Sequence, residues 1–399
     1  MRIGVHCFPL KANIGGMRQY FLSLFTELLA HDDENEYVFF HNAGNVAELS
    51  QLPSSRWRGN AVELGRASRV AKHLKGLDLY FSPFVILTPR PLSLPTVVTI
   101  PDNQEVFFPD FFSQEQKFTR EWHYRGSARM ADRVLTISHF SRETISEHYR
   151  ISSDKISVAP LCADPLYFRA GETGRRPAAL LPEGKYLFYP ANRWQHKNHE
   201  GLLRALRILV VEKGLDLRLV LTGHDVDGGY PVMQKAAEYG VADRVFPAGY
   251  VTPEELAWLY HHAEMMVFPS LFEGFGLPLV EAMAAGCPVA ASRAGSMPEV
   301  GGDAVENFDP HSAPEMAAVI ERVCGSPALR AALSERGRAR AAEFSPARLA
   351  LAHLQAFREA RAAYNPLRYA WNLLFERHYD AWTMARKYPA CAAAARAKK

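Results

Sequence analysis

Short apolar segments alternate with amphipathic ones through the first half of the chain. Apolar runs bounded by turn residues lie at residues 2–8, 37–41, 78–83, 95–100, 132–138 and 155–160. Residues 19–30 follow the first run and carry apolar side chains at helical spacing. Strands that alternate with helices are typical of a parallel sheet covered on both faces. The pattern therefore predicts a doubly wound α/β domain.

The alternation breaks once and then begins again. Residues 171–184 are rich in Gly, Pro and Arg and lack periodicity, so they are predicted to be a linker. Further apolar runs then lie at residues 185–191, 217–223, 244–249, 265–270 and 288–292, and helical patterns at residues 199–213, 232–239, 253–262 and 278–285. We therefore predict two Rossmann-like domains, residues 1–172 and 173–360. Because ligands of open parallel sheets bind beyond the carboxyl ends of the strands, the two sheets are expected to face a central cleft.

Composition narrows the class of protein. The chain is 48% hydrophobic and 22% charged, which is ordinary for globular proteins. Its 399 residues are too many for one compact hydrophobic core, so two domains are expected. A net charge of +3 gives no reason to expect a nucleic-acid partner. The five cysteines form no CxxC pair, which argues against zinc and disulfides and favours a reducing compartment. Without a signal-peptide pattern or a long apolar segment, we expect a cytoplasmic protein, or one peripheral to the inner face of a membrane.

Two glutamates stand eight positions apart in the segment EGFGLPLVEAMAAGCP, residues 273–288. Glu273 is expected in a loop and Glu281 in the first turn of a helix that begins near Pro278. The glycines between them let backbone amides approach a ligand, and a helix N-terminus suits a diphosphate. A carboxylate repels phosphate but accepts hydrogen bonds from hydroxyls, so the pair suggests a nucleotide sugar. The plainer alternative is a solvated loop residue and a partner of the helix dipole.

The same segment resembles the E-x7-E signature of the family 4 retaining glycosyltransferases, which have the GT-B fold. Other segments resemble that family in the expected order: residues 131–149, 188–206, 219–225, 245–260 and 291–304. The resemblance extends from residue 1 to about residue 350. It implies a GT-B architecture in which the first domain faces the acceptor and the second binds the donor.

The resemblance also implies roles for individual residues. Glu273 contacts hydroxyls of the transferred sugar, Glu281 binds the ribose, and Lys197 neutralises the departing diphosphate. The other implied donor-binding residues are Gly15, Gly16, Asn192, Arg193, Gly223, Val251, Phe275, Gly276 and Leu277. Of these, Gly15 and Gly16 open the first helix, Val251 borders the base, and the last three offer backbone amides to the diphosphate.

Two positions depart from the family pattern. An arginine usually stands five residues before the lysine, but Asn192 occupies that place and Arg193 is one residue closer. Because side chains alternate along a strand end, this shift turns Arg193 away from the expected direction. The acceptor motif often carries a histidine before an aspartate, and here Pro101 precedes Asp102. The acceptor-side role then falls to Asp102 and Asn103. Asp102 is also expected to be catalytic, together with Glu273 and Lys197.

The function implied is a retaining hexosyltransferase without metal or cofactor. It would move mannose or rhamnose from a nucleotide diphosphate sugar, for example GDP-mannose, to a saccharide acceptor, free or lipid-linked, in surface polysaccharide synthesis. Two alternatives stay open. One is a nucleotide-sugar epimerase or a phosphorylase of the same shape, and the other is a catalytically silent binding subunit.

The last segment, residues 361–399, carries eight Lys and Arg against two acids, together with Trp and Phe side chains. In transferases of this shape the last helix crosses back to the first domain, and a frayed tail would follow it. Basic charge beside Trp and Phe also fits the surface of an anionic membrane. The two interpretations are compatible.

Overall fold

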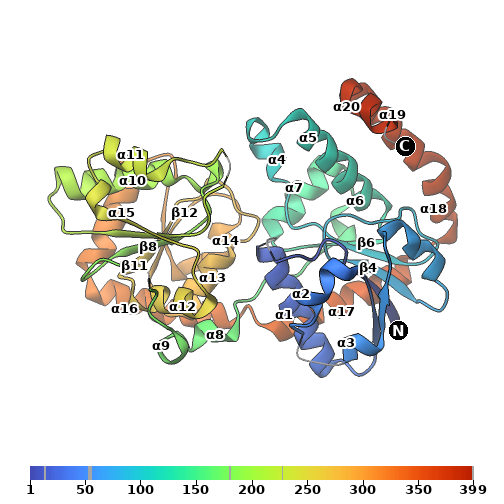
Figure 1. The fold of residues 1–399 in the computed structure, drawn as a ribbon, viewed down its shortest axis with the longest axis horizontal. Coiled ribbons are helices and arrows are strands. Elements are labelled where there is room, and N and C mark those ends of the chain that lie inside the picture. Colours follow the sequence, from blue (N-terminus) through green and yellow to red (C-terminus); the bar gives the residue numbers. More distant parts are fainter. Residues whose placement is uncertain (13–14, 53–55, 179–180, 227, 398–399) are drawn as a thin grey trace. The chain divides into compact units, whose positions relative to one another are not determined.

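The computed structural model describes residues 1–12, 15–52, 56–178, 181–226 and 228–397, which form two compact units (Figure 1). The first unit comprises residues 1–161 and 346–399, and the second comprises residues 162–345. Each unit has one parallel sheet with helices, as predicted. Within the described ranges, no helix has both the length and the apolar character needed to cross a membrane.

The sheet of the first unit has seven strands in the order β3-β2-β1-β4-β5-β6-β7. They are β1 (Arg2–His6), β2 (Glu36–His41), β3 (Ala61–Glu63), β4 (Leu79–Ser82), β5 (Thr96–Thr99), β6 (Arg133–Thr136) and β7 (Ile156–Val158). The α-helices are α1 (Gly16–His31), α2 (Val46–Leu49), α3 (Arg56–Gly59), α4 (Gln104–Phe107), α5 (Gln114–Arg120), α6 (Gly126–Met130), α7 (His139–Tyr149), α17 (Pro346–Ala363), α18 (Pro366–Trp371), α19 (Arg377–Lys387) and α20 (Pro389–Ala397). Strands β4 and β5 are buried throughout, as expected for central parallel strands.

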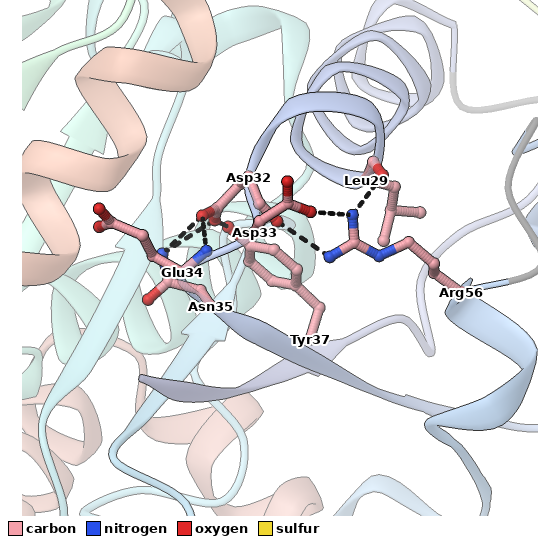
Figure 2. A network of polar contacts seen from close by, with 7 residues as sticks. All are labelled: Leu29, Asp32, Asp33, Glu34, Asn35, Tyr37 and Arg56. Carbon is pink, nitrogen blue, oxygen red and sulfur yellow. Dashed lines mark hydrogen bonds and ion pairs between the residues drawn. The ribbon is translucent and has the colours of Figure 1, made fainter.

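A polar network fixes the turn from α1 into β2 (Figure 2). The side-chain amide of Asn35 donates to both carboxylate oxygens of Asp32, at 3.0 and 2.9 Å, and the Tyr37 hydroxyl donates to the same carboxylate. The Arg56 guanidinium donates to the backbone oxygens of Leu29 and Asp32, at 2.9 and 3.0 Å. The last carbonyls of α1, which lack partners within the helix, thereby gain donors.

The sheet of the second unit has six strands in the order β10-β9-β8-β11-β12-β13. They are β8 (Leu187–Pro190), β9 (Leu219–Thr222), β10 (Val245–Gly249), β11 (Met265–Phe268), β12 (Val289–Ser292) and β13 (Glu306–Phe308). Its α-helices are α8 (Pro165–Phe168), α9 (Ala170–Thr173), α10 (His199–Arg207), α11 (Val232–Glu238), α12 (Pro253–His262), α13 (Leu277–Ala284), α14 (Met297–Gly301), α15 (Ala313–Gly325) and α16 (Pro327–Ala342). Helices α10, α11 and α15 cover one face, and α12, α13 and α16 the other (Figure 1).

The unit boundaries precede the predicted ones at residues 172 and 360. Residues 162–172 pack on the second unit, where the Tyr167 ring meets the edge of the Tyr260 ring at a centroid distance of 5.8 Å. The start of the predicted linker is also ordered, since the Arg175 N–H donates to the Glu254 carbonyl at 3.0 Å. Residues 179–180 of that linker and the last two residues of the predicted frayed tail lie outside the described residues.

Candidate functional site

The candidate donor site lies at one edge of the second sheet. Strands β8, β9 and β11 run parallel, with Leu187 opposite Leu219 and Met265, so their carboxyl ends share one edge. The segments after these three strands carry Lys197, Gly223 and Glu273. This is the edge at which open parallel sheets bind ligands.

Lys197 and Glu273 lie side by side. The Lys197 Nζ is 2.6 Å from the Glu273 Oε1, and the two side chains are 17% and 13% exposed. The segment before Lys197 is bound to the loop after β11, because the Leu271 N–H donates to the His196 carbonyl at 2.8 Å. The Tyr189 hydroxyl donates to the Lys197 carbonyl at 2.8 Å. The structure thus brings together two of the predicted catalytic residues in a mostly desolvated ion pair.

A turn after β12 holds the backbone of Glu273. The N–H and the hydroxyl of Ser296 both donate to the Glu273 carbonyl, at 3.1 and 3.0 Å. Gly295 has a φ of +58°, and a Cβ there would lie 2.6 Å from that carbonyl oxygen. Sequence reasoning assigned no role to Gly295 or Ser296. The glycine in a turn after a predicted strand was the only available signal, since a turn that contacts a distant loop leaves no pattern in the sequence.

Helix α13 begins at Leu277, and Gly276 caps it with a φ of +87°. Pro278 stands in the first turn, where its missing N–H costs no hydrogen bond. The first N–H groups of a helix have no partner within the helix. Phe275, Gly276 and Leu277 lie at this N-terminal end of α13, which is the end that suits an anion. Glu281, however, lies in the second turn of α13, not in the first turn as predicted, because the helix starts one residue earlier.

Glu281 is buried rather than open to solvent. The Tyr260 hydroxyl donates to its Oε2 at 3.0 Å. Burial raises the pKa of Glu281 to about 7; the Tyr260 hydrogen bond opposes the rise, and the Asp164 carboxylate adds to it. Glu281 therefore changes its charge near neutral pH, which the sequence did not reveal.

Asn192 and Arg193 take different directions. The Asn192 Oδ1 accepts from the His224 N–H at 2.8 Å, so this side chain ties the segment after β8 to the turn after β9. Arg193 is buried, its Nε lies 3.3 Å from the Asp225 Oδ1, and it lines a cavity of about 410 Å³ together with Tyr230. Lys197 turns to Glu273, whereas Arg193 turns to Asp225.

The turn after β9, which carries the predicted donor-binding residue Gly223, lies beside the turn after β10, which was predicted to border the base. The Gly223 N–H donates to the Gly249 carbonyl at 2.9 Å, and a Cβ on Gly223 would meet the Ala191 backbone at 2.7 Å. The His224 and Tyr250 rings stack at a centroid distance of 4.8 Å, and Tyr250 is 69% exposed. Val251 follows and is half-buried. An exposed aromatic stack of this kind offers a flat surface to a base.

The remaining predicted residues belong to the first unit. Gly15, with a φ of +56°, and Gly16 open α1, and a Cβ on either would meet no described atom within 4 Å. The Asp102 Oδ1 accepts from the Gln104 N–H at 3.2 Å. Asn103 has no exposed surface, and its amide bonds twice to Thr144, at 3.1 and 2.9 Å. Asn103 thus joins α4 to α7 and offers no open surface to an acceptor, contrary to the prediction.

Sequence reasoning also missed a buried carboxylate beside Asp102. Glu105 pairs with Arg120 at 3.2 Å and accepts from the Tyr149 hydroxyl at 3.3 Å. Burial raises the pKa of Glu105, and the Arg120 charge opposes the rise. Its position in a four-residue helix, where no apolar period can be read, hid this burial from the sequence.

Two family profiles match successive parts of the chain. "Glycosyltransferase Family 4" matches residues 14–165, and "Glycosyl transferases group 1" matches residues 172–340. The chain therefore belongs to the glycosyltransferases that combine a family 4 domain with a group 1 domain. The predicted resemblance is confirmed, and the two parallel α/β sheets are those of a GT-B glycosyltransferase.

Individual relatives agree with this assignment. The glycosyltransferase is 27% identical to O-antigen chain mannosyltransferase B of Escherichia coli over 84% of this chain and 94% of the relative. It is 36% identical to the MMP alpha-(1->4)-mannosyltransferase of Mycolicibacterium hassiacum over 54% of this chain and 51% of the relative. The structure of Anabaena HepE in complex with UDP shares the fold, with a TM-score of 0.67 and 15% identity over 89% of this chain and 98% of that one.

Proposed function

We propose that this glycosyltransferase transfers mannose from a nucleoside diphosphate donor, such as GDP-mannose, to a saccharide acceptor in the synthesis of a surface polysaccharide. The observation that carries the proposal is the Lys197–Glu273 pair near the N-terminus of α13. A cation, a carboxylate and a helix N-terminus at the ligand-binding edge of a parallel sheet suit a diphosphate joined to a sugar. The names of both relatives favour mannose over rhamnose.

Lys197 is proposed to bind the diphosphate without leaving Glu273. An ammonium group has three N–H donors, and the contact with Glu273 uses one of them. The others can reach phosphate oxygens, while the backbone amides of Phe275, Gly276 and Leu277 are proposed to bind the opposite side of the diphosphate. Leaving-group charge would then be stabilised by protein groups alone, so no metal is required in this proposal.

The transfer is proposed to retain the configuration at the anomeric carbon. The acceptor hydroxyl enters on the face from which the diphosphate departs, a bond forms between its oxygen and the anomeric carbon, and the bond from that carbon to the phosphate oxygen breaks. The hydroxyl proton passes to the departing phosphate oxygen. Positive charge develops on the sugar ring in the transition state, and the Glu273 carboxylate stabilises it. Asp102 is proposed to orient the acceptor hydroxyl.

The proposal is tested with purified protein, a panel of donors and a mannose-terminated saccharide acceptor. We expect transfer from GDP-mannose but not from dTDP-rhamnose, an α-linked product by NMR, and equal rates with EDTA and with Mg²⁺. A β-linked product would exclude retention, and activity lost in EDTA and restored by Mg²⁺ would exclude the metal-free mechanism. Donor epimerised without an acceptor would point to an epimerase. Nucleotide binding without turnover would indicate a silent binding subunit.

A further inference from the structure

The C-terminal segment of the first unit has one face fixed to that unit. The Arg368 guanidinium donates to the backbone oxygens of Arg129 and Ala131, each at 3.2 Å. Asn372 is buried, and its amide reaches the Met130 carbonyl at 3.5 Å. Further along, Lys387 pairs with Glu121 at 2.7 Å, and Figure 1 shows the end of the segment beside α5. These contacts hold the segment as a surface layer rather than as a loose tail.

The opposite face carries large apolar side chains. Leu367, Trp371 and Leu374 recur at positions i, i+4 and i+7, the spacing of one helical stripe, and they are 78%, 55% and 61% exposed. Trp382, in the next helix, is 58% exposed. Most surfaces of monomeric proteins expose apolar residues singly, so a stripe of this length marks an interaction surface.

Positive charge accompanies the apolar stripe. Arg386 is exposed, and its guanidinium lies 5.6 Å from the centroid of the Trp382 ring. Arg361, near the end of α17, is also exposed and pairs with Asp78 at 3.7 Å. From residue 361 onward the sequence holds eight basic residues and two acidic ones. The segment thus has an excess of positive charge in its sequence, and within the described residues Arg386 places a cation beside the exposed Trp382 ring.

We propose that the tail face, defined as Leu367, Trp371, Leu374, Trp382 and Arg386, binds the surface of a membrane that contains anionic lipid. Tryptophan rings favour the boundary between lipid headgroups and hydrocarbon, and leucines enter the acyl region. Anionic headgroups attract basic residues near the surface. A protein partner would not by itself require the charge excess, so charge complementarity favours lipid. The proposal does not depend on which sugar the enzyme transfers.

The test is flotation of the full-length protein with vesicles. We expect the protein to float with vesicles of phosphatidylglycerol and phosphatidylcholine, and about tenfold less with phosphatidylcholine alone. The double variant Trp371→Glu/Leu374→Glu should lose flotation by about tenfold, since charged side chains do not enter the acyl region. Arg386→Glu should weaken flotation at low salt and have less effect at high salt, where charges are screened.

A matched control lies on another helix of the same unit. Leu351, on α17, is 65% exposed and outside the tail face, so Leu351→Glu should float like the wild-type protein. The proposal fails if the wild-type protein does not float with anionic vesicles, or if the double variant floats as well as Leu351→Glu. If light scattering shows instead a dimer that only the double variant disrupts, without flotation, the tail face binds a second copy. Transferase activity toward a water-soluble acceptor reports separately on the proposed function.

Discussion

At the scale of residues, the contact between Lys197 and Glu273 determines what each substitution does. Glu273→Gln removes the carboxylate but leaves the ammonium free to bind phosphate, so affinity for GDP should stay equal or rise. The turnover number should fall by about 100-fold, because the charge that stabilises the transition state is lost. Lys197→Ala should lower the affinity for GDP by about 1.5–3 kcal/mol, because a charge-assisted hydrogen bond to the diphosphate is lost. Calorimetry and initial rates measure both quantities.

A matched control for these variants is Glu315→Gln, which removes the carboxylate of an exposed ion pair with Arg293 in the same unit. It should change neither GDP affinity nor turnover, since exposed pairs contribute little. If Glu273→Gln lowered GDP affinity as much as Lys197→Ala, the assignment of the lysine to the diphosphate and of the glutamate to the sugar would be wrong.

Glu281 should make stability depend on pH. Its pKa is about 7 in the folded protein and 4.5 without the fold, so between these values the folded state binds more protons than the unfolded one. Stability contributed by the protonated form is therefore lost as pH rises from 4.5 to 7. Glu281→Gln is neutral and can still accept from Tyr260, so above pH 7 it should be more stable than wild type by roughly 3 kcal/mol.

Urea unfolding of the wild-type protein and of Glu281→Gln at pH 5 and pH 8 measures this effect. We expect the gap between the two proteins to widen at pH 8. Glu315→Gln serves again as the control and should follow the wild-type protein at both values. A gap that is the same at pH 5 and pH 8 would mean that the carboxylate of Glu281 is already charged at the lower value.

At the scale of elements, the turn after β12 positions Glu273. Gly295→Ala would place a Cβ 2.6 Å from the Glu273 carbonyl oxygen, so the loop must move. We expect turnover to fall by more than about tenfold, since small displacements of a reacting group are costly. Gly240→Ala is the matched control, because Gly240 also has a positive φ of +71° but no described atom within 4 Å of the added Cβ.

Both glycine variants should lose about 1–2 kcal/mol of stability from the unfavourable backbone conformation. Only Gly295→Ala should also lose turnover, as measured by initial rates beside thermal unfolding. Equal turnover in the two variants would show that the Glu273 loop tolerates displacement, and that the turn after β12 stabilises the unit without positioning the carboxylate.

The elements show what sequence patterns can and cannot predict. Most strands were predicted because each lies in a short apolar run. Strands β3 and β13 have the sequences AVE and ENF, and the glutamate in each interrupts such a run. The pair of Glu273 and Lys197 was named from sequence, but their direct contact was not, because it joins segments 76 positions apart. The burial of Glu281 could not be predicted from the sequence for a similar reason, since its neighbours Tyr260 and Asp164 come from other parts of the chain.

At the scale of the whole molecule, the chain returns to its first unit earlier than the sequence indicated. Helix α17 belongs to that unit, and its His353 is fully buried. The His353 Nδ1 lies 2.8 Å from the Leu349 carbonyl, so this nitrogen carries the proton and Nε2 accepts from the Tyr20 hydroxyl at 2.6 Å. Tyr20 in turn accepts from Thr99 at 2.8 Å, which connects α17 through α1 to β5. Apolar periodicity alone cannot reveal to which unit a helix returns.

If this connection holds α17 in the first unit, Tyr20→Phe should destabilise that unit without touching the donor site. The substitution keeps the ring but leaves the buried Nε2 of His353 and the hydroxyl of Thr99 without their shared partner. An unsatisfied buried group costs about 1–3 kcal/mol, which should lower the urea midpoint. Tyr369→Phe, in the half-buried part of α18, is the control and should change the midpoint little. GDP affinity should be unchanged in both variants. A Tyr20→Phe protein as stable as the control would mean that apolar packing alone, rather than the buried hydrogen bonds, holds α17 to the first unit.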